Sequence, residues 1–186
     1  MTHEVAYNSL LVQRRKELHR LIALAIEELY ADRLADQFAV LAYHFTKGEE
    51  WAKALEYLLK AAEKAAQAFA SREAVVLYDQ ALEAAGQQDA AVDARTLMAI
   101  YQAKSNLYFA LSDFERARAE GERLLTLASQ TQDRESEGAA LGRMAYASRW
   151  AHDFDRALAS ARQAIAVGRD GGSRGRLPSP AAGFAQ

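Results

Sequence analysis

The 186-residue sequence contains no cysteine, and both of its prolines, Pro178 and Pro180, lie within the last nine residues. Without cysteine there is no disulfide, no thiol nucleophile and no cysteine-ligated zinc site. Proline breaks helices, so its absence before Pro178 permits long helices along most of the chain. The alternating β-branched runs and turn dipeptides that mark strands are also missing. The sequence therefore predicts an all-α protein.

Charge and hydrophobicity exclude further classes of protein. The net charge is −2, so the chain lacks the basic excess typical of nucleic-acid-binding proteins. The N-terminus shows no basic start followed by an apolar run, which argues against a signal peptide. No run of about 18 apolar residues is present, so no membrane span is predicted. We expect a cytoplasmic protein without nucleic-acid or membrane partners.

Apolar residues recur with helical spacing along most of the chain, which predicts eight helices. Their expected ranges are about 8–30, 34–47, 50–69, 71–85, 90–111, 112–129, 134–150 and 153–168. Ser71 and Asp153 are expected N-caps, and Ser112 with Glu115 fits a capping box. Gly48 is expected to end the second helix. The Gly/Ser/Pro/Ala-rich segment 169–186 is predicted to be a disordered tail.

Four of the expected helices open with an aromatic or serine residue that an alanine follows three positions later. The pairs are Trp51 with Ala54, Ser71 with Ala74, Phe114 with Ala117, and Phe154 with Ala157. A small residue lets two helices approach closely, and an aromatic residue fills the wedge between them. We therefore expect these alanines, Phe114 and Phe154 to be buried. Recurrence of one helical unit is typical of a stacked helical array.

Three stretches of the chain resemble tetratricopeptide repeats, over residues 34–168. The residues that carry the resemblance are Leu41, Ala42, Phe45, Trp51 and Ala54, then Tyr101, Ser105, Tyr108, Phe114 and Ala117, then Leu141, Met144, Ala145, Phe154 and Ala157. The resemblance implies a right-handed superhelical array of antiparallel helix pairs, with about eight helices. It also implies a role in binding other proteins.

The N-terminal part is similar to a family of bacterial signalling proteins, over residues 3–85. Matching positions include the Arg14-Arg15 pair, His44-Phe45 and Trp51. In that family a P-loop ATPase precedes tetratricopeptide repeats, often with a cyclase or DNA-binding regulator domain. This chain has no Walker A motif and no cyclase metal-binding motif, so nucleotide chemistry is assigned to no residue here. The resemblance implies that 1–33 is a helix left from a junction with an upstream domain, and that 34–168 is the regulatory or sensor array.

No pattern in the sequence indicates catalysis. The histidines are His3, His19, His44 and His152, and no two of them have the i, i+3 or i, i+4 spacing of a helical metal site. We interpret His44 as a partly buried structural residue. The serines have no histidine and acid at motif spacing. We therefore expect no enzyme activity, no catalytic residue, no metal and no cofactor.

The resemblance places six residues on the concave face of the array, where a protein or peptide partner would bind. They are Tyr43, Gln102, Asn106, Arg143, Tyr146 and Arg149. Asn106 and Arg143 match positions that clamp a peptide carboxylate in some family members, and arginine suits that role because its fork donates two parallel hydrogen bonds. However, Gln102 stands where such a clamp has lysine, and Ala139 stands at another of its positions.

Two alternatives to this hypothesis remain. One is a small-ligand sensor, with Tyr43 and Tyr146 as the walls of its groove. The other is a stand-alone adaptor that dimerises through its last helix. The apolar face of that helix requires a neighbour, and it consists of Phe154, Ala157, Leu158, Ala161 and Ile165.

Overall fold

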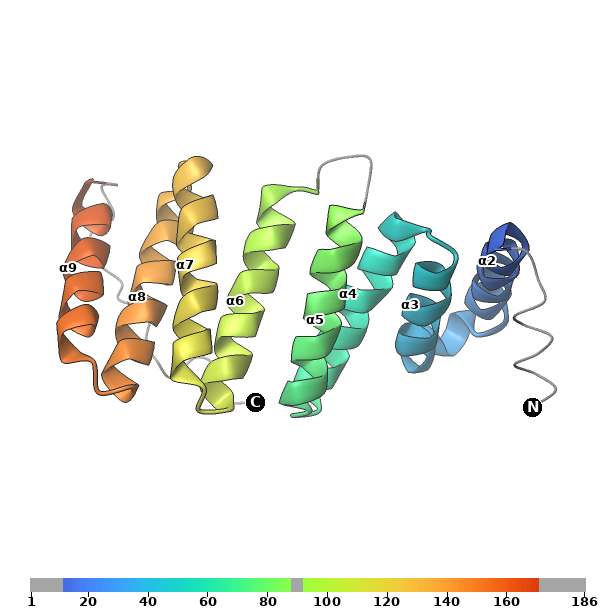
Figure 1. The fold of residues 1–186 in the computed structure, drawn as a ribbon, viewed down its shortest axis with the longest axis horizontal. Coiled ribbons are helices and arrows are strands. Elements are labelled where there is room, and N and C mark those ends of the chain that lie inside the picture. The colour runs from blue at the N-terminus through green and yellow to red at the C-terminus, as the bar shows by residue number, and fades with distance from the viewer. Residues whose placement is uncertain (1–11, 88–91, 171–186) are drawn as a thin grey trace. The chain divides into compact units, whose positions relative to one another are not determined.

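A computed structural model describes residues 12–87 and 92–170, which are almost entirely helical (Figure 1). No strand occurs in these ranges, so the predicted all-α class is confirmed. None of the helices in these ranges combines the length and the apolar character needed to cross a membrane. The chain divides into two compact units, Met1–Val92 and Asp93–Gln186. The predictions for residues 1–11, 88–91 and 171–186 lie outside the described residues.

The described part of the first unit contains four α-helices and one 3-10 helix. They are α2 (Val12–Leu29), η1 (Ala31–Gln37), α3 (Phe38–Lys47), α4 (Trp51–Gln67) and α5 (Ser71–Gly86). Successive α-helices pack on one another. Phe45 of α3 is fully buried and stacks on Tyr57 of α4, with ring centroids 5.6 Å apart. The predicted helix from about Leu34 does follow a break, because Arg33 has non-helical angles, but 34–37 is 3-10 helix and the α-helix begins only at Phe38.

The described part of the second unit contains four α-helices. They are α6 (Ala94–Ala110), α7 (Phe114–Gln130), α8 (Arg134–Trp150) and α9 (Phe154–Asp170). Each packs on the next, and α6 also contacts α8. Met98, Leu124, Ala128 and Ala140 form a buried cluster. Among the described residues, the predicted fifth helix begins only at Ala94, because 92–93 is not helical. Helix α9 continues past its predicted end at Gly168.

One turn geometry recurs in the described ranges. A non-glycine residue with φ between 56° and 61° lies two positions before the next helix, at Glu49, Phe69, Ser112, Gln132 and His152. The residue after it donates its N–H to a carbonyl five positions earlier, as Glu50 does to Phe45 at 2.9 Å. This is the Schellman arrangement. It makes successive helices antiparallel, and it recurs every 20 residues from Ser112 to His152.

The alanine–aromatic pattern coincides with the helix starts. Ala54, Ala74 and Ala117 are each at most 2% exposed, which confirms their predicted burial. Ala157 is only half-buried. The expectation for Phe154 is wrong, because 64% of this residue is exposed. Phe154 begins α9, and no further described helix covers that side of it.

The predicted caps are partly confirmed. Asp153 accepts a hydrogen bond from the N–H of Arg156 at 3.1 Å, as expected of an N-cap. The predicted capping box of Ser112 and Glu115 is wrong, because Ser112 occupies the turn and Asp113 caps α7 by accepting from the N–H of Arg116. Ser71 is the first helical residue of α5 rather than its cap. Gly48 does end α3.

Candidate binding surfaces

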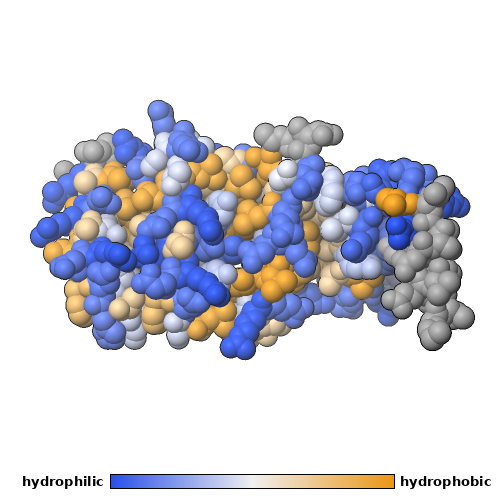
Figure 2. Space-filling model, in the orientation of Figure 1, coloured by the Kyte–Doolittle hydropathy of each residue, from blue (hydrophilic) through white to orange (hydrophobic). Residues whose placement is uncertain are grey.

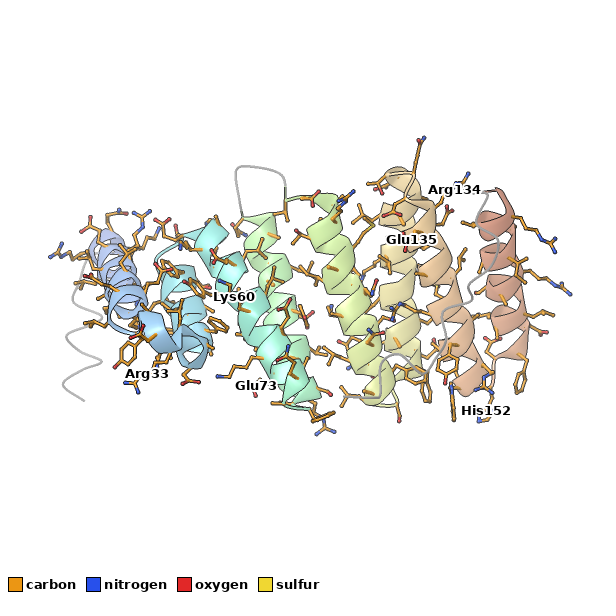
Figure 3. The ribbon with its side chains drawn as sticks, turned by 180° about the vertical axis from the view of Figure 1, so that it is seen from behind. Arg33, Lys60, Glu73, Arg134, Glu135 and His152 are labelled. Atoms are coloured by element: carbon orange, nitrogen blue, oxygen red, sulfur yellow. The ribbon has the colours of Figure 1, made fainter. Side chains whose placement is uncertain are left out.

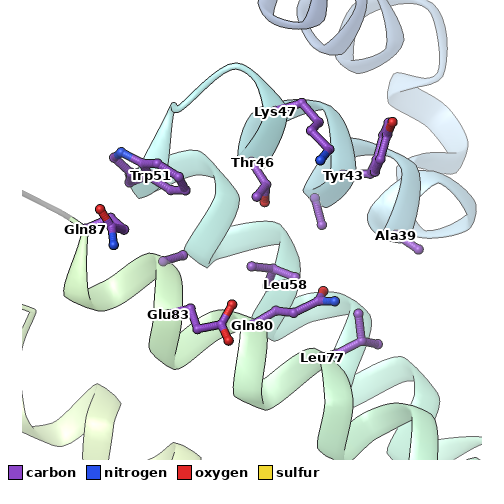
Figure 4. Close-up of a pocket in the computed structure, with 12 residues that line it drawn as sticks. Ala39, Tyr43, Thr46, Lys47, Trp51, Leu58, Leu77, Gln80, Glu83 and Gln87 are labelled. Atoms are coloured by element: carbon purple, nitrogen blue, oxygen red, sulfur yellow. The ribbon is translucent and has the colours of Figure 1, made fainter. Parts of the chain in front are cut away.

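A groove of about 570 Å³ runs between α3 and α5 of the first unit, with α4 beneath it (Figure 4). It is open to solvent on one side. Its floor on α4 is apolar, with Trp51 and Leu58, and each wall mixes apolar and polar side chains. The residues that line it are Ala39, Ala42, Tyr43, Thr46, Lys47, Trp51, Leu58, Leu77, Gln80, Glu83, Ala84 and Gln87.

The two walls of the groove carry opposite charges. Lys47 lies on the α3 wall, where its ammonium is 5.8 Å from the ring centroid of Tyr43. Glu83 lies on the α5 wall, between Gln80 and Gln87 on the same helical stripe (Figure 4). Within the part of the chain that the structure describes, neither Lys47 nor Glu83 forms an ion pair. Both charges are therefore available to a bound molecule.

A second surface lies on α6 and α8 of the other unit. Arg143 of α8 donates a hydrogen bond from Nη1 to the Oδ1 atom of Asn106 on α6. Its Nε atom is buried and has no hydrogen-bond partner, and burial lowers the pKa of this guanidinium. Gln102 lies exposed one turn before Asn106. A guanidinium suits an anionic ligand by its chemistry, whereas the buried Nε atom is closed off from solvent.

Aromatic side chains gather beside this polar pair. Tyr146 of α8 stacks on Phe109 of α6, with centroids 4.9 Å apart. Trp150 stacks on Phe114 at 6.2 Å and is 46% exposed. The guanidinium carbon of Arg149 lies 5.4 Å from the Tyr146 ring and 5.1 Å from that of Trp150. Tryptophan, tyrosine and arginine are the residue types that most often dominate binding interfaces.

The six predicted contact residues divide between the two units. Tyr43 lines the groove of the first unit. The other five lie on α6 and α8 of the second unit, where Asn106 meets Arg143 and Tyr146 meets Arg149. The hypothesis of one shared concave face stays a prediction. The sequence interpretation overlooked Lys47, Trp51 and Glu83 of the groove. Tyr43 and Lys47 are four residues apart, a spacing that places both side chains on the same face of α3 and could have predicted this wall of the groove.

Two histidines meet at the contact between α2 and α3. The Nδ1 atoms of His19 and His44 lie 2.9 Å apart, so one ring donates to the other. Burial lowers the pKa of both rings, and the positive charge of Lys47 adds to this for His19. The interpretation of His44 as a structural residue did not anticipate its partner. Nowhere in the described residues do three metal-ligating side chains come together.

A buried ion pair joins α6 to α7. Lys104 and Glu120 are 3% and 4% exposed, and the Lys104 Nζ atom lies 2.8 Å from Glu120 Oε1. Arg123, whose side chain lies nearer the surface, places its Nη1 atom 2.6 Å from the same oxygen. The other carboxylate oxygen, Oε2, is buried without a hydrogen-bond partner. Because the pair is closed off from solvent, we assign it a structural role.

No family model and no curated protein matches this sequence. A crystal structure of BtubC (BKLC) from P. vanneervenii is 13% identical to it. The match covers 96% of this chain and 99% of that chain, with a TM-score of 0.30. A likeness this weak carries no argument about fold or function.

Proposed function

We propose that this protein is a non-catalytic binding module of the tetratricopeptide type, which holds a segment of another polypeptide in the groove between α3 and α5. The observation that carries the proposal is the groove itself, with an apolar floor and opposite charges on its walls. Tyr43 and Trp51 are the anchors, because amphipathic aromatic side chains bury large area at low entropic cost.

The shape of the groove favours a polypeptide over a small molecule. Small-molecule sites commonly enclose most of the ligand surface, whereas this groove is open along one side. The opposite charges select the orientation of the occupant. A bound segment places an acidic side chain toward Lys47 and a basic or hydrogen-bond-donating side chain toward Glu83, which gives specificity more than affinity.

The second surface extends the same function to the other unit. The guanidinium of Arg143, with the amide of Asn106 beside it, pairs with a carboxylate of a partner. Residues 3–85 resemble a family of bacterial signalling proteins, and this resemblance supports a role for the module within such a protein. We propose that it is the regulatory or sensor region of a cytoplasmic signalling ATPase or transcriptional regulator.

The test begins with selection of peptides from a displayed random library against the full chain. Binding of a selected peptide is then measured by titration calorimetry. We expect Tyr43→Ala and Lys47→Glu each to weaken binding by about tenfold or more. Lys60→Glu is the matched charge reversal, since Lys60 pairs with Glu56 and does not line the groove. Equal affinities for all four proteins would refute the assignment of the groove.

A small-molecule sensor is the second candidate, because the groove volume of about 570 Å³ lies within the usual range for such sites. A metabolite panel read by thermal shift separates the two functions. A metabolite that stabilises the wild type but not Tyr43→Ala would favour the sensor. Selection of groove-dependent peptides without any such metabolite would favour the binding module.

A further inference from the structure

The last described helix exposes an apolar stripe. Phe154, Leu158 and Ile165 of α9 are 64%, 51% and 49% exposed, although the opposite side of the helix packs on α8 and buries Ser160. Ala161 and Gly168 lie on the same edge of the helix, so the stripe has the alternating spacing of four and three residues. This is the spacing of a coiled-coil seam. Figure 2 shows hydrophilic residues interspersed with apolar ones over α7 and α8 on the face in view.

The stripe is complementary to itself in one orientation. When two copies of α9 run antiparallel with their centre beside Ala161, Phe154 of one lies opposite Gly168 of the other. Leu158 then lies within one residue of the level of Ile165. A Cβ atom added at Gly168 would meet nothing within 4 Å, so there is open space above this residue for a large ring. Phe154 of each copy therefore fits the space above Gly168 of the other copy, so the two ends of the contact are equivalent, as two-fold symmetry requires.

The charges beside the stripe favour the same orientation. Asp155 begins the helix and Arg169 lies near its end, both on one flank of the stripe. In an antiparallel pair, Asp155 of each copy lies beside Arg169 of the other. In a parallel pair, this flank would face the opposite flank of the partner, so these two charges would not pair with each other. Antiparallel helix dipoles add to the preference.

We propose that α9 is a self-association surface, on which a second copy of this chain docks its own α9 in antiparallel orientation. Only three large apolar residues per copy take part, so the contact is small. We therefore expect a weak dimer that forms with increasing protein concentration. This inference is independent of the groove, which lies in the other unit.

Sedimentation equilibrium of the full 186-residue chain tests association, at concentrations up to about 1 mM. We expect a reversible monomer–dimer equilibrium for the wild type and a monomer for Leu158→Glu. Leu24→Glu is the matched control, because Leu24 is 53% exposed on α2 of the other unit. It should dimerise as the wild type does. A wild type that is monomeric throughout, or a dimer that Leu158→Glu leaves intact, would overturn the proposal. The first outcome would mean that another protein, or further helices of a longer chain, cover this face.

Orientation is tested by charge reversal and cross-linking. Arg169→Glu should weaken dimerisation by about tenfold, and adding Asp155→Arg in the same chain should restore it. Because the chain has no native cysteine, single cysteines report proximity directly. A mixture of Asp155→Cys and Gly168→Cys chains should form a mixed disulfide on oxidation. Preferential disulfide formation between two Asp155→Cys chains would indicate a parallel pair and contradict the proposal.

Discussion

The buried pair Lys104–Glu120 is predicted to be strongly coupled energetically. Lys104→Met leaves Glu120 buried beside Arg123, whereas Glu120→Met takes the carboxylate away from both the buried Lys104 and Arg123. Breaking a buried pair by removing one partner typically costs about 3–5 kcal/mol. We expect about 3 kcal/mol for Lys104→Met, because Arg123 still contacts the carboxylate at 2.6 Å. We expect the upper end of the range for Glu120→Met.

The double variant Lys104→Met/Glu120→Met should lie within about 1 kcal/mol of the wild type or above it, because apolar side chains of similar volume replace both charges. The assay is urea unfolding in a Trp51→Phe background. The chain has two tryptophans, so the fluorescence of Trp150 then reports on the second unit alone. Losses that simply add in the double variant would refute the coupling.

Three further predictions concern stability. Phe69→Gly should raise the free energy of unfolding by about 1 kcal/mol, because Phe69 has φ of 59° and is 90% exposed, and thermal melts should show a higher midpoint. Burial lowers the folded-state pKa values of His19 and His44. At pH values below the unfolded pKa of about 6.5, the unfolded chain therefore takes up protons that the buried rings do not. The contribution to stability is full above this pH and falls as the pH decreases below it. Urea midpoints between about pH 7 and pH 5 measure this slope, which a His19→Asn/His44→Asn variant should reduce. Ala117→Leu should lower stability by about 1–3 kcal/mol through overpacking, because Ala117 is 2% exposed where α7 begins, and an unchanged melting midpoint would contradict the packing argument.

Much of the helical pattern could be predicted because it depends on local spacing. Ala54, Ala74 and Ala117 recur at helix starts, and their burial follows from the close approach of two helices. The turns were located less accurately. Their left-handed residues are not glycine, so the usual sequence signal is missing. Ser112, which the sequence predicts as a cap, occupies the turn itself.

The parts that could not be predicted depend on which helices lie side by side. His19 meets His44 only because α2 crosses α3, and their separation of 25 residues gives no local signal. The groove likewise exists because α3 and α5 are separated above α4. The separation of two helices cannot be predicted from the spacing of residues along the sequence. The exposure of Phe154 reflects the lack of a described neighbour beyond α9, rather than any property of the residue.

Hydrogen–deuterium exchange of the full chain, with and without a selected peptide, tests the central claim most directly. Bound polypeptide should slow exchange in α3 and α5, at the residues that line the groove, and the Lys47→Glu variant should lose this protection. If the peptide leaves the exchange rates of Phe38–Lys47 and Ser71–Gly86 unchanged, the account is contradicted.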